Sequence, residues 1–275
     1  MRQTLLLLIL ILAAGAGRAA KVDTVSTSSH DMHKDIKAVV ITPADYNTSR
    51  KFPVLYLLHG YSGNYGDWIN KDPEITKLSD EYHMIIVCPD GNFSSWYFDS
   101  AVKPNSKYET YVASELVSWI DKHYSTIASR NGRAITGLSM GGHGALYLAF
   151  RHPAVFGAAG SMSGGVDLRP FPQNWELEKV LGKYSENPEN WEKNSVINML
   201  YLITPNQLDL IIDCGNEDFF NGCNNKLHKK LLERKIPHDY TVRPGGHTWE
   251  YWTNSIRYQT LFFYNYFKRV QGKMP

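Results

Sequence analysis

Cysteine is scarce in this chain, which contains three cysteines among 275 residues. An odd number of cysteines without the spacing of a zinc site argues against a disulfide framework and against a structural metal. Cys88 and Cys214 each end an apolar run, where a buried thiol is an ordinary packing residue. A bond between Cys214 and Cys223 in an oxidising compartment stays open at this point. We expect no metal site.

An excess of charge of one sign is also missing. The chain has 29 basic and 27 acidic residues. Arg2 and Arg18, which lie in an N-terminal leader, account for the difference, so the rest of the chain carries 27 charges of each sign. A balanced chain has no basic field to hold nucleic acid or an anionic membrane surface. We therefore expect no nucleic-acid partner.

The first twenty residues have the composition of a secretory signal peptide. Arg2 supplies the positive start, residues 5–12 are an unbroken apolar run, and residues 13–20 are rich in alanine and glycine. This run is too short for a membrane helix, which needs about 20 apolar residues. We expect cleavage near Ala19 or Ala20, no membrane anchor afterwards, and a secreted or periplasmic mature protein.

Residues 21–275 predict a single α/β domain. Apolar runs typical of strands covered on both faces alternate with segments of helical spacing, which indicates a mostly parallel sheet with right-handed crossovers. The predicted strands are residues 36–41, 52–58, 84–88, 133–136, 155–160, 208–213 and 238–242, and the predicted helices are residues 73–82, 108–124, 144–150, 225–235 and 249–270.

One long segment, residues 165–207, interrupts this alternation. It contains several prolines and aromatic residues and only short helical patterns. A long insertion directly after a core strand is either a cap over an active site or a packed surface excursion. Both interpretations stay open.

The most informative motif is a Gly-x-Ser-x-Gly pattern at residues 137–141, between a predicted strand and a predicted helix. The chain must turn sharply there, and Gly137 and Gly141 would let strand and helix approach each other. Ser139 is then presented at a helix N-terminus, where backbone N–H groups and the helix dipole favour developing negative charge. This context predicts Ser139 as a catalytic nucleophile.

A serine nucleophile needs a base that takes its proton. His247 follows the last predicted strand, directly after two glycines, and precedes the last predicted helix. This position places the imidazole at the carboxyl edge of the sheet, where the sites of such folds collect. It also makes His247 the last member in chain order, as in an α/β-hydrolase. We predict His247 as the base.

An acid that orients the base should follow a strand between Ser139 and His247. The loop after the strand predicted at residues 208–213 contains Asp218 beyond a turn glycine. Asp218 is the preferred acid. The neighbouring Glu217 and the strand residue Asp213 remain as alternatives.

His59 and Gly60 begin the loop after the strand predicted at residues 52–58. In a hydrolase this loop donates one N–H of the oxyanion hole, and the residue after the nucleophile donates the other. We therefore expect the oxyanion donors to be the backbone N–H groups of Tyr61 and Met140.

Candidates for substrate contact lie in or next to the loops at this edge of the sheet: His59, Gly60, Trp96 and Trp249. The insertion adds Trp175 and Trp191. Such aromatic rings suit stacking on a sugar or a cinnamoyl ring, and they suit a core equally well.

Four segments taken in order resemble the esterase D or putative esterase family of α/β-hydrolases: residues 57–60, 137–142, 214–218 and 245–247. The resemblance runs over about residues 30–270. The family includes feruloyl and acetyl xylan esterases, tributyrin-type esterases, S-formylglutathione hydrolases and mycolyltransferases. It implies an α/β-hydrolase fold, a three-layer sandwich with a mostly parallel central sheet. It implies the same roles for the residues named above: Ser139, Asp218, His247, Tyr61 and Met140.

The sequence thus predicts a secreted serine carboxylesterase for short-chain or aryl esters, such as acetyl or feruloyl esters of plant polysaccharides. It needs no metal and no organic cofactor. An S-formylglutathione hydrolase uses the same triad, but the leader opposes a cytoplasmic enzyme. An acyltransferase stays an alternative, although the chain lacks the Asp-Gly turn and the clear glutamate acid of mycolyltransferases. An inactive hydrolase fold acting as a binding module would usually lack a triad residue. The acyl group, the alcohol and a homo-oligomeric state stay open.

Overall fold

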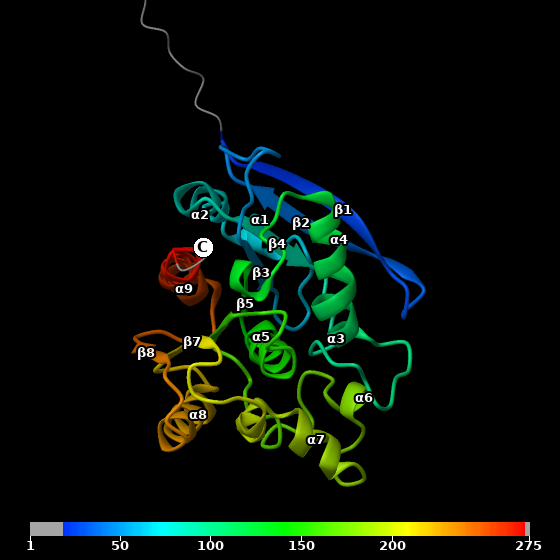
Figure 1. Cartoon of the computed structure of the whole chain (residues 1–275). Coiled ribbons are helices and arrows are strands. Elements are labelled where there is room, and N and C mark those ends of the chain that lie inside the picture. The colour runs from blue at the N-terminus through cyan, green and yellow to red at the C-terminus, as the bar shows by residue number, and fades with distance from the viewer. Residues whose placement is uncertain (1–18, 273–275) are drawn as a thin grey trace, which may run out of the picture.

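The computed structural model describes residues 19–272. In this part of the chain a sheet of eight strands forms the centre of the molecule, with helices on both faces (Figure 1). The strands are β1 (Lys21–Ser29), β2 (Lys34–Thr42), β3 (Val54–Leu58), β4 (Ile85–Pro89), β5 (Arg133–Gly137), β6 (Ala158–Met162), β7 (Asp209–Gly215) and β8 (Asp239–Arg243). The α-helices are α1 (Asp67–Lys71), α2 (Ile75–Tyr82), α3 (Tyr108–Thr110), α4 (Val117–His123), α5 (Met140–Arg151), α6 (Glu178–Leu181), α7 (Pro188–Asn194), α8 (Asn221–Glu233) and α9 (Trp249–Gln271). A π-helical turn, Tyr111–Leu116, joins α3 to α4.

The order of the strands brings the predicted site residues to one edge of the sheet. The order is β1-β2-β4-β3-β5-β6-β7-β8. Strands β3 to β8 run parallel, whereas β2 pairs antiparallel with β4 and β1 pairs antiparallel with β2. Because parallel strands end at the same edge, the loops after β3, β5, β7 and β8 gather there.

Two apolar cores hold the layers together. On one face α4, α5 and α8 pack against the sheet, with buried side chains such as Tyr147 and Leu227. On the other face α1, α2 and α9 contribute Trp68 and Phe263, among others. The predicted three-layer sandwich with a mostly parallel central sheet is confirmed.

Two strands differ from the prediction. The sequence of β1 is rich in serine and threonine and has no apolar run, so it is not predicted; the strand forms by backbone pairing with β2 at the edge of the sheet. The strand predicted at residues 155–160 lies at Ala158–Met162 and contains Gly160 and Ser161, both buried. A small residue is required there, because a Cβ at Gly160 would overlap the side chain of Gln259 on α9.

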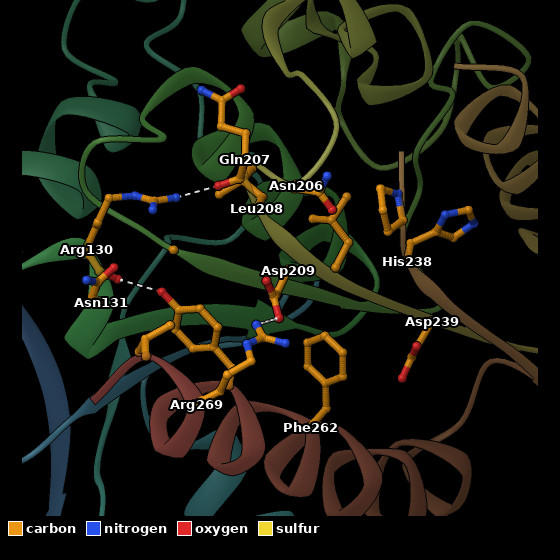
Figure 2. A pocket seen from close by; sticks show the side chains of 15 residues that line it. Arg130, Asn131, Asn206, Gln207, Leu208, Asp209, His238, Asp239, Phe262 and Arg269 are labelled. Carbon is orange, nitrogen blue, oxygen red and sulfur yellow. Dashed lines mark hydrogen bonds and ion pairs between the residues drawn. The ribbon is translucent and has the colours of Figure 1, made fainter. Parts of the chain in front are cut away.

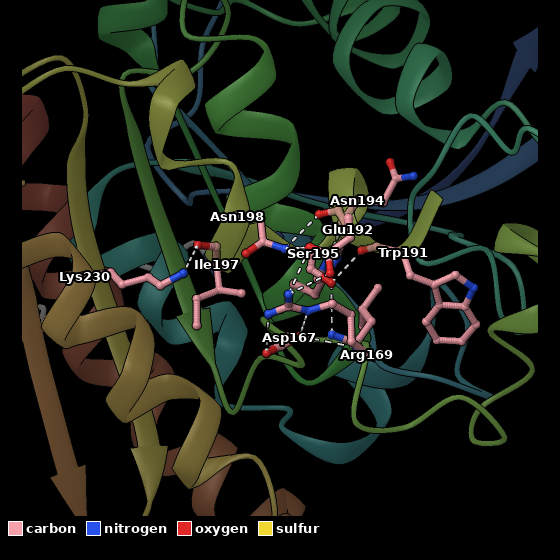
Figure 3. A network of polar contacts seen from close by, with 11 residues as sticks. Asp167, Arg169, Trp191, Glu192, Asn194, Ser195, Ile197, Asn198 and Lys230 are labelled. Atoms are coloured by element: carbon pink, nitrogen blue, oxygen red, sulfur yellow. Dashed lines mark hydrogen bonds and ion pairs between the residues drawn. The ribbon is translucent and has the colours of Figure 1, made fainter. Parts of the chain in front are cut away.

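The insertion at residues 165–207 folds into α6, α7 and two 3₁₀ turns, and a polar network joins its first residues to α7 and the residues after it (Figure 3). The guanidinium of Arg169 donates to Asp167 at 2.8 and 3.0 Å and to Glu192 at 2.9 Å. The Ser195 hydroxyl accepts from the N–H of Leu168 at 3.1 Å. The insertion is therefore a packed unit rather than an open loop.

The predicted signal peptide occupies residues 1–20, and residues 1–18 lie outside the described part of the chain. Strand β1 begins at Lys21, just after the predicted cleavage region. Between residues 19 and 272, no helix is both long enough and apolar enough to cross a membrane.

Candidate active site

Ser139 lies in the turn between β5 and α5, with backbone angles of φ 54° and ψ −115°. A non-glycine residue in this region is strained and persists only where the surrounding structure holds it. The two flanking glycines provide the space. A Cβ at Gly137 would lie 2.7 Å from the Cβ of Leu58, and a Cβ at Gly141 would lie 2.5 Å from the carbonyl oxygen of His59. The turn therefore has the geometry that the motif predicts.

The structure brings Ser139, His247 and Asp218 together, although they lie far apart in the sequence. The Ser139 hydroxyl oxygen is 2.8 Å from Nε2 of His247, and Nδ1 of His247 is 2.8 Å from Oδ2 of Asp218. The Asp218 carboxylate is buried, and its other oxygen accepts the N–H of Phe220 at 2.8 Å. In this chain of hydrogen bonds the serine donates to Nε2, and the Nδ1–H donates to the carboxylate.

The two alternative acids lie elsewhere. Glu217 is exposed, and its backbone N–H donates to the carbonyl of Gly245 at 3.0 Å. Asp213 is buried within β7, where it pairs with Arg243 and accepts from the Ser255 hydroxyl at 2.9 Å. Asp218 is thus the acid that faces the histidine.

The predicted oxyanion donors lie on either side of Ser139 in the fold. Met140 is the first residue of α5, and Tyr61 lies in the loop after β3. Within residues 19–272 neither backbone N–H has a hydrogen-bond acceptor. Both groups are therefore available to a ligand oxygen, and the Met140 N–H adds the positive end of the α5 dipole.

A cavity of about 360 Å³ opens at Ser139 and His247. Gly60 and Trp249, two of the predicted contact residues, line it, as do Tyr61 and Trp175. The insertion thus packs as a surface excursion and also reaches the site through Trp175.

The structure corrects two of the predicted substrate contacts. Trp96 is 1% exposed, and its indole N–H donates to the carbonyl of Trp175 at 3.3 Å, so it supports the cavity wall from behind. His59 is also 1% exposed and does not line the cavity. Trp191 in the insertion is fully buried. The position of Trp96, His59 and Trp191 in the sequence does not reveal that they are buried, because segments from elsewhere in the chain cover their rings.

Two aromatic residues at the site were not predicted. Trp252 lines the cavity with its ring 4.9 Å from the His247 ring, edge to face. Phe219 is 53% exposed, and its ring centroid lies 4.3 Å from that of the same imidazole. Its ring also stacks on the Trp175 ring, with 5.6 Å between the centroids. Trp252 follows Trp249 by three residues on a predicted helix, a spacing that places both on one face. No comparable signal identifies Phe219.

A larger cavity, of about 580 Å³, lies at the opposite edge of the sheet, where β7 and β8 begin (Figure 2). Three of its charged groups already have partners: Arg269 pairs with Asp209, and Arg130 donates to the carbonyl of Gln207. None of its lining residues forms a pair of nucleophile and base. The smaller cavity at Ser139 is therefore the candidate active site.

The described residues form neither a metal-binding site nor a reactive thiol site. From residue 19 to residue 272, no group of three or more His, Cys, Asp or Glu side chains is arranged to hold a metal ion. All three cysteines are buried and free, so Cys214 and Cys223 are not bonded to each other. Burial raises the pKa of Cys223 to about 11 and raises the pKa of Cys88 and Cys214 further, which keeps the thiols protonated.

Known proteins resemble this chain over most of its length. The family model described as putative esterase matches residues 29–263. Esterase MT1326 of Mycobacterium tuberculosis is 42% identical over 240 residues, which cover 76% of this chain and 51% of that protein. An acetyl esterase of Caldicellulosiruptor saccharolyticus is 26% identical over 220 residues, with 76% of this chain and 82% of that protein covered. The chain spans about half the length of the mycobacterial relative that it matches.

The comparison of structures agrees with the comparison of sequences. A solved ferulic acid esterase superimposes with a TM-score of 0.79 and 28% sequence identity, covering 90% of this chain and 99% of that chain. The resemblance predicted from four short segments is thus confirmed over nearly the whole described region. The chain belongs to the putative esterase family and has the α/β-hydrolase fold.

Proposed function

We propose that this chain is a serine carboxylesterase that works through an acyl-enzyme. The observation that carries the proposal is the unbroken chain of two 2.8 Å hydrogen bonds from Asp218 through His247 to Ser139. Ser139, the last residue in this series of hydrogen bonds, lines a cavity that a small ester can enter. Membership of an esterase family supports the same conclusion.

The geometry of the three residues suits nucleophilic catalysis. Nε2 of His247 takes the Ser139 proton as the serine oxygen attacks the ester carbonyl. Asp218 holds the imidazole in the required tautomer and stabilises the imidazolium. The imidazolium then gives its proton to the departing alcohol, and a water molecule, activated by the same histidine, releases the acyl group from Ser139.

The negative charge that develops on the carbonyl oxygen requires preorganised donors. The N–H groups of Tyr61 and Met140 are assigned this role, since both lack an acceptor within the described chain and flank the nucleophile. Removing one such donor from a hydrolase typically lowers kcat by about 10²–10³-fold.

The proposed substrates are short-chain or aryl esters, with acetyl or feruloyl esters of plant polysaccharides as the preferred class. Aromatic side chains in the cavity wall, Tyr61, Trp175 and Trp249, suit stacking on a planar acyl group or a sugar. Relatives named acetyl esterase and ferulic acid esterase support this class. The signal-peptide composition of residues 1–20 supports export of the enzyme, as an extracellular polymer requires.

A thioesterase activity is the second candidate. The S-formylglutathione hydrolase of Bos taurus is 26% identical over 235 residues, the same identity as the acetyl esterase, and covers 76% of this chain. The same triad can hydrolyse thioesters as well as esters, so only a comparison of substrates distinguishes an esterase from a thioesterase.

The test is hydrolysis of matched substrates: methyl ferulate, an acetylated xylo-oligosaccharide, 4-nitrophenyl acetate and butyrate, and S-formylglutathione. Ser139→Ala should lower turnover by at least about 10³-fold. Ser161→Ala is the matched control, because this buried serine lies in β6 and its hydroxyl has no hydrogen-bond partner among residues 19–272. Preference for ferulate or acetyl-xylan supports the proposal, whereas preference for S-formylglutathione favours the thioesterase. Turnover that survives in Ser139→Ala would contradict both.

A further inference from the structure

The imidazole of His59 is buried, and both of its nitrogens are engaged. Nδ1 lies 2.8 Å from the carbonyl oxygen of Gly60, and Nε2 lies 2.7 Å from the backbone nitrogen of Gly91. A carbonyl oxygen only accepts and a backbone N–H only donates, so the partners determine the tautomer. Nδ1 carries the hydrogen and donates to Gly60, and Nε2 accepts from Gly91.

The ring is suited to stay in this single state. Burial lowers the pKa of His59, which keeps the imidazole neutral. Protonation of Nε2 would also place its N–H against the N–H of Gly91, and two donors cannot form a hydrogen bond with each other. His59 is thus a fixed structural donor toward Gly60.

The carbonyl that His59 binds belongs to the same peptide group as the proposed oxyanion donor. The Gly60 carbonyl and the Tyr61 N–H share one peptide plane, and this peptide is trans, so the two groups point in opposite directions. The Gly60 oxygen accepts a second hydrogen bond from the N–H of Gly63 at 3.1 Å. Two donors therefore hold the back of the peptide, which fixes the direction of the Tyr61 N–H. Hydrogen bonds on a carbonyl also polarise the N–H of the same amide.

The support for this peptide comes from the loop after β4. Besides the bond from Gly91 to the His59 ring, the N–H of Ser62 donates to the Phe93 carbonyl at 2.7 Å. The Tyr97 hydroxyl donates to the His59 carbonyl at 3.1 Å. The loop after β3 is thus held by a neighbouring loop that itself contributes nothing to the triad.

We infer that His59 is a positioning residue for the oxyanion hole: its Nδ1–H, by binding the Gly60 carbonyl, aims and polarises the Tyr61 N–H. The inference rests on the proposed esterase function. It replaces the substrate contact that the sequence suggested for His59, and it assigns the loop after β4 a role in transition-state stabilisation.

Two substitutions separate the two nitrogens. The amide nitrogen of Asn reaches about the position of Nδ1, so His59→Asn keeps the donor to Gly60 and loses the acceptor for Gly91. His59→Gln extends toward Gly91, so it keeps the acceptor there and loses the donor to Gly60. Each variant loses one buried hydrogen bond, which makes them a matched pair for stability.

We expect His59→Gln to lower kcat by about 10–100-fold, with KM within about threefold of the wild type, because the affected interaction strengthens in the transition state. His59→Asn should keep kcat within about fivefold. A trifluoromethyl ketone, which forms a tetrahedral oxyanion with a serine nucleophile, should bind His59→Gln more weakly by the same factor as kcat falls.

Equal losses of kcat in the two variants, at equal melting temperature, would overturn the inference. A readout that does not depend on catalysis is the crystal structure of each variant. The Gly60–Tyr61 peptide should rotate in His59→Gln and stay in place in His59→Asn, and an unmoved peptide in His59→Gln would also overturn it. Failure of the esterase proposal is seen separately, as activity that persists in Ser139→Ala.

Discussion

The guanidinium of Arg243 pairs with the carboxylate of Asp213 where β7 and β8 lie side by side. The Arg243 guanidinium also donates to the Ser255 hydroxyl at 2.7 Å and lies 4.5 Å from the ring of Tyr258, both on α9. The loop with Asp218 begins three residues after Asp213, and the loop with His247 begins directly after Arg243. The ion pair therefore joins the two strands that precede the loops of the proposed acid and the proposed base.

Removing one partner of this ion pair should destabilise the protein strongly. The Asp213 side chain is 2% exposed, so Asp213→Ala leaves a guanidinium without its anion in the interior. We expect a loss of about 3–5 kcal/mol in the free energy of unfolding, measured by urea denaturation. The exposed pair of Asp209 and Arg269 is the control, because Asp209→Ala should cost less than about 1 kcal/mol. Similar losses at both positions would contradict this assignment.

Neighbouring acidic residues should differ sharply in their importance for catalysis. Asp218→Asn removes the charge opposite Nδ1 of His247 and favours the wrong tautomer, so kcat should fall by about 10⁴-fold. Glu217→Gln should leave kcat within about twofold, because this exposed side chain does not face the histidine. Steady-state kinetics on 4-nitrophenyl acetate measure both. A larger effect at Glu217 would transfer the role of the acid to that residue.

Gly141, two residues after the nucleophile Ser139, should not tolerate a side chain. In Gly141→Ala the new Cβ would lie 2.5 Å from the His59 carbonyl oxygen and 2.7 Å from that of Leu58, and backbone atoms cannot yield cheaply. We expect loss of activity and a lower melting temperature. Gly222→Ala on α8 is the control: its Cβ would meet no atom of the described chain within 4 Å, and alanine favours a helix by about 0.5–1 kcal/mol. A Gly141→Ala enzyme with wild-type turnover would show that the turn opens more easily than its packing indicates.

Acid should weaken the protein partly through Glu109 on α3. Burial alone would raise the pKa of this carboxyl, but hydrogen bonds from His152, Arg151 and Tyr147 outweigh it and lower the pKa to about 2. A folded-state pKa below the ordinary value of 4.5 means that the ionised form stabilises the fold above about pH 5. This contribution, about 3 kcal/mol, should disappear as the pH falls from 5 toward 2.

Glu109→Gln should therefore unfold more easily than the wild type at pH 7 and about equally at pH 2. Urea denaturation across this range measures the difference. Glu233→Gln at the exposed end of α8 is the control, and its difference from the wild type should stay small at every pH. A gap between Glu109→Gln and the wild type that does not shrink in acid would show that another group accounts for the acid sensitivity.

The sequence predicted the triad because its members carry local signals. Ser139 sits in a strand–turn–helix motif, His247 follows two glycines after the last parallel strand, and Asp218 lies in a strand-exit loop. Parallel strands end at one edge, so residues after them meet there whatever the details of packing. The strand β1 escaped prediction because its polar residues pair through the backbone alone.

By itself, the sequence determined the layers of the fold, through periodicity, and the meeting of Ser139, Asp218 and His247 at one edge of the sheet, through glycines and chain order. Four short motif segments carried the resemblance to the family. Only the tertiary structure decided that Trp96 and His59 are buried supports, and that Phe219 and Trp252 contact the imidazole of His247. The physical reason is that the exposure of a side chain depends on the neighbours that distant segments supply, such as the loop after β4 around His59, and no local pattern encodes them.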